Sequence, residues 1–183
     1  MDRGPEQVLD EYLVLLAQSG SRTAFAQLVI RWSPRLLRYA TRNLSDADLA
    51  ADVVQETWTS GLRTLDRLGD PARFAPWLYA IATRRCADAV RQIGRRRRLK
   101  SQVQVEVAVT GEAAPSRHDG NLDLAAAIRR LPPDQQLTIS LHYGEDLTVE
   151  EVAMALKVPT GTIKSRLFHA RRTLKSYLEG ELQ

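Results

Sequence analysis

The spacing of apolar and polar residues predicts helices along most of the chain, most clearly in its last third. Thr148 and Glu151 have the spacing of a capping box, so a helix is expected to begin there. Its apolar face follows at helical spacing and consists of Val149, Val152, Ala153 and Leu156. Pro159 ends this helix, because proline cannot continue a helix and disfavours helical geometry in the residue before it.

A second helix is predicted from Thr160, whose side chain can cap the first turn. The inward face of this helix consists of Ile163, Leu167, Ala170, Leu174 and Leu178. Two short helices joined by a tight turn form a helix-turn-helix, which places its second helix in the major groove of DNA. The pattern therefore indicates DNA binding.

The outward face of the second helix supports this interpretation. Between Thr160 and Tyr177 the chain has five Lys or Arg residues and no Asp or Glu. A solvent-exposed basic helix is the simpler alternative. Phe168 argues against it, since an exposed aromatic needs a partner such as a thymine methyl group. The candidate contacts to duplex DNA are Thr160, Thr162, Lys164, Ser165, Arg166, Phe168, His169, Arg171 and Arg172.

The first half of the chain is predicted to form a helical bundle. Helices are expected at residues 11–18, 23–32 and 36–43. A further helix should follow Ser45 as its N-cap. Its inward face is predicted to contain Leu49, Val53, Thr57 and Leu62, and its outward face Asp48, Asp52, Gln55 and Glu56. On this pattern alone, the acidic face is either a solvated surface or a docking site for a basic protein.

A loop at residues 66–76 leads into a helix that combines aromatic residues with Arg84, Arg85 and Arg91. Aromatic residues beside arginines suit unstacked single-stranded bases, although Trp77 and Ile81 are expected to lie in the core.

Composition changes after this helix. Residues 95–100 are almost all basic, and residues 101–121 contain Gly, Pro, Ser and alternating valines. The alternation is typical of a strand, but a lone strand has no partner for its backbone, so an extended linker is expected. For the arginine run, contact with phosphate or with a polymerase is favoured over a nuclear-type signal or a solvated helix end.

Charge and composition narrow the possible functions. The chain has 183 residues, a formal net charge of +4 and a pI near 9.5, which suits a polyanionic partner. The single cysteine, Cys86, excludes an intramolecular disulfide and a cysteine-rich zinc site, and a core position is favoured over a redox sensor. The histidines, His118, His142 and His169, lack metal-ligand or acid–base spacing, so we expect no metal, cofactor or catalytic residue.

No apolar run is long enough to span a membrane, and the N-terminal residues do not resemble a signal peptide. We therefore expect no membrane insertion and a cytoplasmic location.

Four motifs, in this order and at these spacings, resemble those of a known family. They are Asp48-Leu-Ala-Ala-Asp-Val-Val-Gln-Glu56, Phe74-Ala-Pro-Trp-Leu-Tyr-Ala-Ile-Ala82, Leu131-Pro-Pro-Asp-Gln-Gln136 and Pro159-Thr-Gly-Thr-Ile-Lys-Ser-Arg166. Over roughly residues 10–180 the chain resembles bacterial RNA polymerase sigma factors of the extracytoplasmic-function group, group 4 of the sigma-70 family. The resemblance implies an all-α fold with an N-terminal domain at 6–95, an extended linker at 96–121 and a C-terminal helix-turn-helix domain at 122–180.

The resemblance also implies a mechanism for promoter-specific initiation. Asp48, Asp52, Gln55 and Glu56 would dock on the coiled coil of the largest polymerase subunit. The helix at residues 160–175 would read the −35 element as duplex. The −10 bases would be handled by Asp66, Arg67, Gly69, Asp70, Phe74, Arg84 and Arg85. Many relatives have Asn at the position of Arg84, whereas Asp88 fits the family pattern.

The expected partners are core RNA polymerase, including the flap of its second-largest subunit, promoter DNA and a restraining anti-sigma protein. The factor would act in the bacterial cytoplasm and join the nucleoid as holoenzyme. A stand-alone helix-turn-helix regulator is the main alternative, but it leaves the acidic face and the Trp77 helix unexplained. An enzyme is the second alternative.

Overall fold

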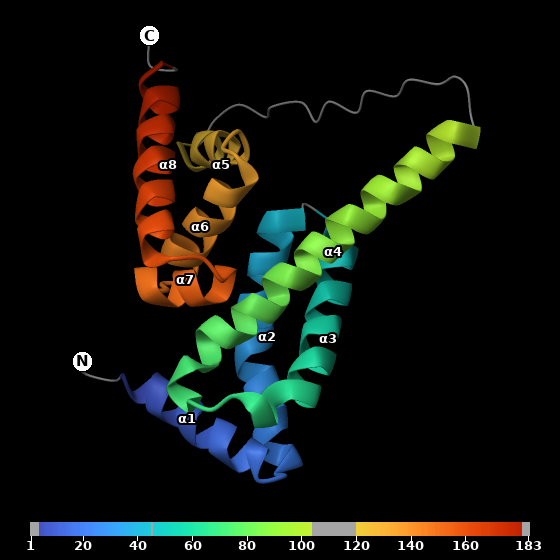
Figure 1. The fold of residues 1–183 in the computed structure, drawn as a ribbon, viewed down its shortest axis with the longest axis vertical. Coiled ribbons are helices and arrows are strands. Elements are labelled where there is room, and N and C mark those ends of the chain that lie inside the picture. Colours follow the sequence, from blue (N-terminus) through green and yellow to red (C-terminus); the bar gives the residue numbers. More distant parts are fainter. Residues whose placement is uncertain (1–3, 45, 104–119, 181–183) are drawn as a thin grey trace.

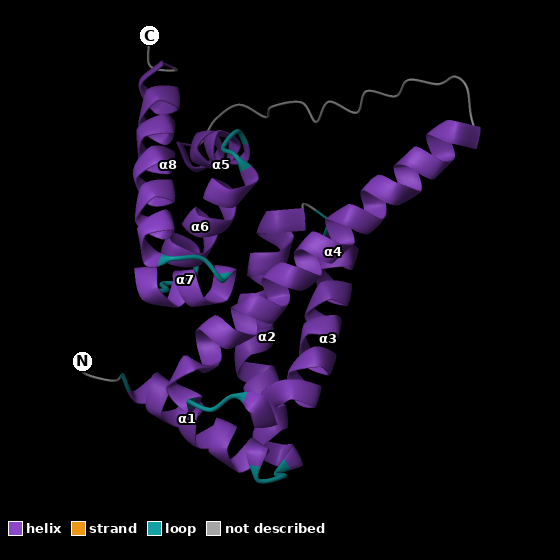
Figure 2. Ribbon diagram, in the orientation of Figure 1, coloured by secondary structure: helices purple, strands orange, loops and turns teal. Residues whose placement is uncertain are grey.

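The computed structural model describes residues 4–44, 46–103 and 120–180, and these residues form helices without a β-strand (Figures 1 and 2). The first four helices are α1 (Pro5–Gln18), α2 (Arg22–Leu44), α3 (Ala47–Thr64) and α4 (Phe74–Val103). Two 3₁₀ turns, η1 (Leu65–Arg67) and η2 (Pro71–Arg73), join α3 to α4. The last four are α5 (Gly120–Arg129), α6 (Pro133–Gly144), α7 (Val149–Leu156) and α8 (Thr160–Gly180). The predicted all-α class is confirmed.

An aromatic core holds the N-terminal helices together. Trp32 on α2 packs edge-on against Phe74 and Tyr79 of α4, with ring centroids 5.5 and 6.2 Å apart. Tyr39 packs against Tyr79 at 5.3 Å, and its hydroxyl lies 2.7 Å from Thr83 Oγ1. Burying a large apolar side chain stabilises a fold by about 1.5–3 kcal/mol. This cluster therefore fixes α4 firmly against α2.

Two details of the bundle differ from the sequence prediction. The two helices expected at residues 23–32 and 36–43 are one helix, α2, in which Pro34 is exposed. The N-cap of α3 is Asp46, whose carboxylate accepts a hydrogen bond from the Leu49 amide at 3.0 Å, whereas Ser45 lies outside the described residues. An acidic side chain at this position also interacts favourably with the helix dipole.

The inward face of α3 was predicted correctly except at its end. Val53 and Thr57 are buried, but Leu62 is 62% exposed. Leu62 lies nine residues after Val53, which at about 100° per residue places it on the opposite side of the helix. Gly61 is buried in its place, and a Cβ there would lie 3.7 Å from the Trp77 ring.

The helix-turn-helix is formed by α7 and α8. The capping box at Thr148 and Glu151 is present in both directions. Lys157 ends α7 in the left-handed region with φ of 55°. On α8 the predicted inward residues Ile163, Leu167 and Ala170 are buried. Leu174 and Leu178, nearer the end of the helix, are only half-buried.

Helix α4 continues to Val103, so residues 96–103 extend a helix where we expected the linker to begin. The remaining alternating valines and His118 lie outside the described residues. The two groups of helices are in contact: α7 packs on α4, and α6 touches α2 (Figure 1). Among the described residues, no helix is long and apolar enough to cross a membrane, and no cluster of three His, Cys, Asp or Glu side chains is placed to hold a metal ion.

Candidate DNA-binding and polymerase-binding surfaces

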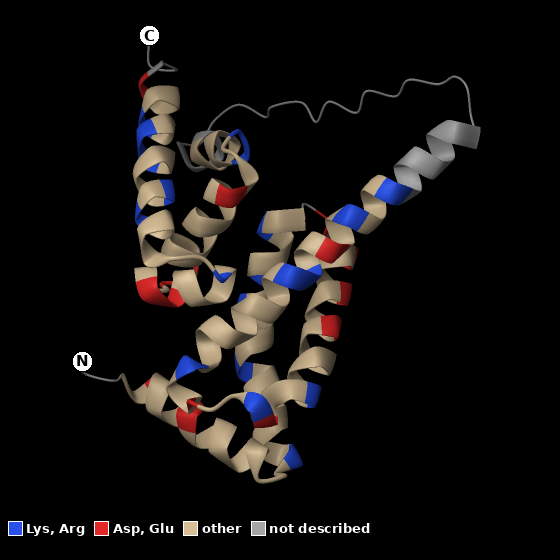
Figure 3. Cartoon of the chain, in the orientation of Figure 1, with Lys and Arg blue, Asp and Glu red and all other residues tan. Residues whose placement is uncertain are grey.

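Most of the predicted DNA contacts lie on the solvent-exposed side of α8. The exposed residues are Thr160, Lys164, Ser165, Phe168, His169, Arg171 and Arg172, and Thr162 is half-buried. The Phe168 side chain is 57% exposed, and its ring lies edge-on to that of His169 at 5.4 Å. The buried face described above anchors α8 while this face stays open (Figure 3 shows its Lys and Arg positions). The exposed side of α8 therefore presents several hydrogen-bond donors and one apolar ring to solvent.

Arg166 is the exception on this helix. Its guanidinium pairs with the carboxylate of Asp134 on α6, and its side chain is only 22% exposed. It also lines a groove of about 870 Å³ between the C-terminal helices, mainly α6 and α7, and the N-terminal helices α3 and α4. In this conformation Arg166 therefore ties α8 to α6.

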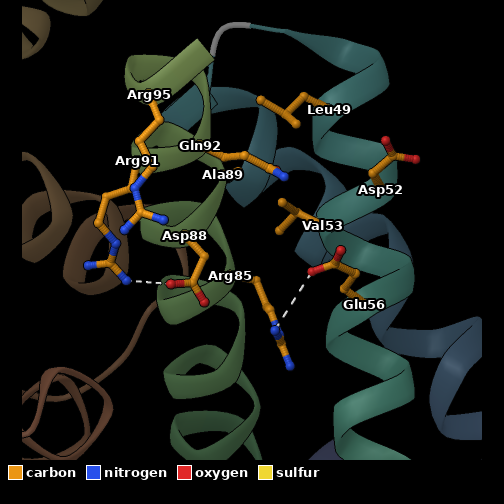
Figure 4. A pocket seen from close by; sticks show the side chains of 10 residues that line it. All are labelled: Leu49, Asp52, Val53, Glu56, Arg85, Asp88, Ala89, Arg91, Gln92 and Arg95. Atoms are coloured by element: carbon orange, nitrogen blue, oxygen red, sulfur yellow. Dashed lines mark hydrogen bonds and ion pairs between the residues drawn. The ribbon is translucent and has the colours of Figure 1, made fainter. Parts of the chain in front are cut away.

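The acidic face predicted on α3 is exposed along its length. Asp48, Asp52, Gln55 and Glu56 are all exposed, and Figure 3 marks the acidic positions of α3 in red. Beside them, a hollow of about 560 Å³ lies between α3 and α4 (Figure 4). Its α4 wall is formed by Arg85, Asp88, Ala89, Arg91, Gln92 and Arg95.

Two ion pairs organise this hollow. Glu56 lies 3.8 Å from Arg85 across it, and Asp88 pairs with Arg91 along α4 (Figure 4). Asp52 remains directed to solvent (Figure 4). The surface thus presents carboxylates beside guanidinium groups, with its most negative edge on α3.

Of the residues predicted to contact the −10 bases, most are exposed and two are buried or half-buried. Asp66, Arg67, Gly69 and Asp70 are exposed on the turns between α3 and α4, and Arg84 is exposed on α4. Asp70 is held locally, because its carboxylate accepts from the Ala72 amide at 3.1 Å and pairs with Arg73 at 3.2 Å.

Phe74 and Arg85 have other partners in this structure. The Phe74 side chain is 2% exposed and packs in the aromatic core, so its ring is not available to a base. Arg85 donates a hydrogen bond to Ser60 Oγ at 2.6 Å in addition to its pairing with Glu56. The burial of Phe74 follows from its position beside Trp32 and Trp77, which helical periodicity within α4 alone does not reveal.

Comparison with known proteins decides the family. Residues 28–97 match the family described as Sigma-70 region 2, and residues 121–174 match Sigma-70, region 4. The ECF RNA polymerase sigma-E factor of Escherichia coli (strain K12) is 30% identical over 185 residues, covering 95% of this chain and 96% of that protein. The RNA polymerase sigma-H factor of Pseudomonas aeruginosa is also 30% identical, covering 94% and 95%. The chain belongs to the sigma-70 family.

Solved structures are also similar to this chain. One, described as CnrH in complex with the cytosolic domain of CnrY, has a TM-score of 0.71 at 25% identity and covers 94% of this chain and 98% of that one. Another is the sigma factor RpoE in complex with the anti-sigma factor NepR from Bartonella quintana, with a TM-score of 0.67 at 27% identity, covering 85% of this chain and 96% of that one.

The protein is a sigma factor that directs RNA polymerase to promoters, and sigma factors are initiation factors rather than enzymes. A stand-alone helix-turn-helix regulator is not favoured, since the match to region 2 accounts for the N-terminal helices that such a regulator leaves unexplained.

Buried polar groups outside these surfaces have structural partners. Burial raises the pKa of the Cys86 thiol to about 12, so the thiol stays protonated in the core, where its position was predicted. His142 Nδ1 lies 2.7 Å from the Leu147 carbonyl oxygen, which gives this ring a structural partner in the turn after α6.

One further group of polar residues carries no signal in the sequence. Glu145, in the turn after α6, contacts Arg42 of α2 and Tyr79 of α4. Burial raises the pKa of Glu145, against the opposing effects of the Tyr79 hydrogen bond and of Arg42, Arg38 and Arg35. A single carboxylate in a turn belongs to no helical pattern, so its contacts with distant helices cannot be predicted from the sequence.

Proposed function

We propose that this sigma factor belongs to the extracytoplasmic-function group, group 4, with an N-terminal domain at residues 6–95, a linker at 96–121 and a C-terminal domain at 122–180. The support is that relatives carrying that name align with nearly the whole chain. The two family matches, at residues 28–97 and 121–174, also leave most of the segment proposed as the linker between them.

We propose that α8 reads the −35 element as duplex DNA. The observation that carries this assignment is the exposed basic face of α8, with Phe168 and His169 between its cations, on a helix whose opposite face is buried. Lys164, Ser165, Phe168 and His169 are placed to reach base edges, whereas Arg171 and Arg172 are long cations suited to phosphates. Arg166 must leave Asp134, or share it, before it contacts a phosphate.

We propose that the turns between α3 and α4, together with α4, receive the −10 bases. The turns expose Asp66, Arg67, Gly69 and Asp70, and Arg84 is exposed on α4, whereas Arg85 is half-buried. Extruding a base from its stack costs a few kcal/mol unless a pocket receives it. The role of Phe74 in this proposal is to support the turns from within the core.

We propose that the acidic face of α3 docks on a basic coiled coil of the largest polymerase subunit, and that the C-terminal domain meets the flap of the second-largest subunit. Asp48, Asp52, Gln55 and Glu56 form the α3 surface. Complementary charge speeds association and selects the partner. A cytoplasmic location in a bacterial cell is part of the proposal, as is restraint by an anti-sigma protein, since a solved relative is described in complex with an anti-sigma factor.

Reconstitution tests the proposal. Core polymerase, this protein and a library with randomised −35 and −10 segments should give transcripts whose promoters share one sequence at each element. Core polymerase alone serves as the control. Binding of this protein to a preferred duplex without any effect on polymerase would instead support the stand-alone regulator.

A further inference from the structure

The two groups of helices pack in a way that brings the proposed DNA surfaces together. The groove of about 870 Å³ between them has Arg84 and Arg85 on one wall and Arg166, at the base of the recognition helix, on the other. The buried core is continuous across this contact. We call this arrangement the closed state.

The closed state cannot serve both promoter elements at once. As proposed above, α8 reads the −35 element and Arg84 handles the −10 element. The position numbers of these two elements differ by about 25 base pairs. That separation is about 85 Å along B-DNA at about 3.4 Å per base pair. Because Arg84 of one surface and Arg166 of the other line the same groove, the two surfaces do not reach across that distance, so the domains have to separate on a promoter.

One side chain is seated across the contact. The Glu145 side chain is 3% exposed although it projects from a turn. Its carboxylate accepts hydrogen bonds from the Tyr79 hydroxyl and from the Arg42 guanidinium. Arg35 and Arg38 add positive charge from the same helix as Arg42. All of these partners belong to the N-terminal helices.

The turn is shaped to deliver Glu145. Gly144 lies directly under Arg42, where a Cβ would meet the guanidinium atoms at 3.0–3.1 Å. Asp146 takes a left-handed conformation with φ of 56°, which non-glycine residues seldom adopt. Behind it, the Leu147 amide donates to the Leu141 carbonyl at 3.2 Å, and the Leu147 carbonyl lies 2.7 Å from His142 Nδ1.

We propose that Glu145 is an intramolecular latch that holds the C-terminal helices on the N-terminal helices and is released when the sigma factor engages a promoter. Tyr79 and Arg42 form its seat. The latch belongs to the free chain and needs no second protein.

The site formed by Tyr79 and Arg42 accepts a neutral side chain of the shape of Glu145 but not a positively charged one. A neutral side chain of the same shape fits it, because burial already disfavours the ionised carboxylate. Glu145→Gln should therefore stay closed, with its amide oxygen accepting from Tyr79. Glu145→Arg places a cation against Arg35, Arg38 and Arg42, and should lower the closed-to-open ratio by about tenfold or more. Arg42→Glu should open the chain from the other side, and the double exchange should close it again.

The test is the distribution of distances between spin labels in the free protein, without DNA or polymerase. Labels at Thr23→Cys on α2 and Ser176→Cys on α8 occupy exposed positions, while the native Cys86 is buried. Glu150→Arg on α7 is the matched control, since Glu150 is exposed in the same region. Circular dichroism checks that each variant keeps its helices.

We expect a narrow distribution for the wild type, for Glu145→Gln, for the double exchange and for the control, and a broad one for each single charge reversal. A broad distribution in the wild type, or a narrow one in both single reversals, overturns the latch. Because no promoter is present, this outcome is independent of whether α8 reads −35, which the transcription assay tests separately.

Discussion

Reversing two charges on α3, with Asp52→Lys and Glu56→Lys together, should weaken binding to core polymerase and leave the sigma factor folded. Both carboxylates are exposed. The ion pair that Glu56 makes with Arg85 spans 3.8 Å, with side chains 63% and 35% exposed. Exposed pairs contribute about 0–1 kcal/mol, so unfolding should become easier by about 1 kcal/mol or less.

The expected loss of binding free energy at the polymerase interface is larger than this loss of folding stability. Removing one partner of a desolvated charge pair costs about 2–5 kcal/mol. At about 1.4 kcal/mol per factor of ten, the Kd for core polymerase should rise by about 30-fold or more. A fluorescence titration of labelled sigma factor with core polymerase measures it, with Glu150→Lys as a control that changes an exposed acid elsewhere. A double variant that binds with the wild-type Kd would refute the assignment of this face.

Other changes should separate the remaining roles. Arg171→Ala should weaken binding to every −35 sequence about equally and lower the slope of log affinity against log salt concentration by about one. His169→Ala should instead relax the preference at one or two base pairs by about 1–3 kcal/mol. Transcription from a randomised −35 library at two salt concentrations distinguishes the two variants, and an altered preferred sequence with Arg171→Ala would reverse the roles. Replacing residues 66–70 with Gly and Ser should preserve polymerase binding but change which −10 sequences melt, and permanganate footprints that stay the same across −10 variants would count against this. Because burial raises the pKa of Cys86 to about 12, a thiol reagent at neutral pH should modify it only on unfolding; rapid labelling of the folded protein would contradict its core position.

Sequence periodicity predicted the helices well where one face of a helix is buried. The capping box at Thr148 and the buried side of α8 could be read directly, because both depend on residues within a few positions of one another. Leu62 was placed on the inward face, but it lies nine residues after Val53, on the opposite side of the helix. The helices expected at residues 23–32 and 36–43 are one helix, because Pro34 between them is exposed and leaves the packed side of α2 intact.

The candidate surfaces were predictable only in part, for a related reason. Exposed charges on α3 and α8 follow from the same helical pattern that buries their opposite faces. The burial of Phe74 and the pairing of Arg166 with Asp134 depend on residues from other helices. Glu145 is the extreme case, because its partner Arg42 is 103 residues away in sequence.

We infer that one chain carries two separate DNA-reading surfaces, which work together within a polymerase complex. Photo-crosslinking from positions 67 and 168 in a holoenzyme–promoter complex tests it most directly, since both native side chains, Arg67 and Phe168, are exposed. We expect position 168 to crosslink at the −35 element and position 67 at the −10 element of the same promoter. Crosslinks from both positions to a single element, or from neither position in an active complex, would contradict it.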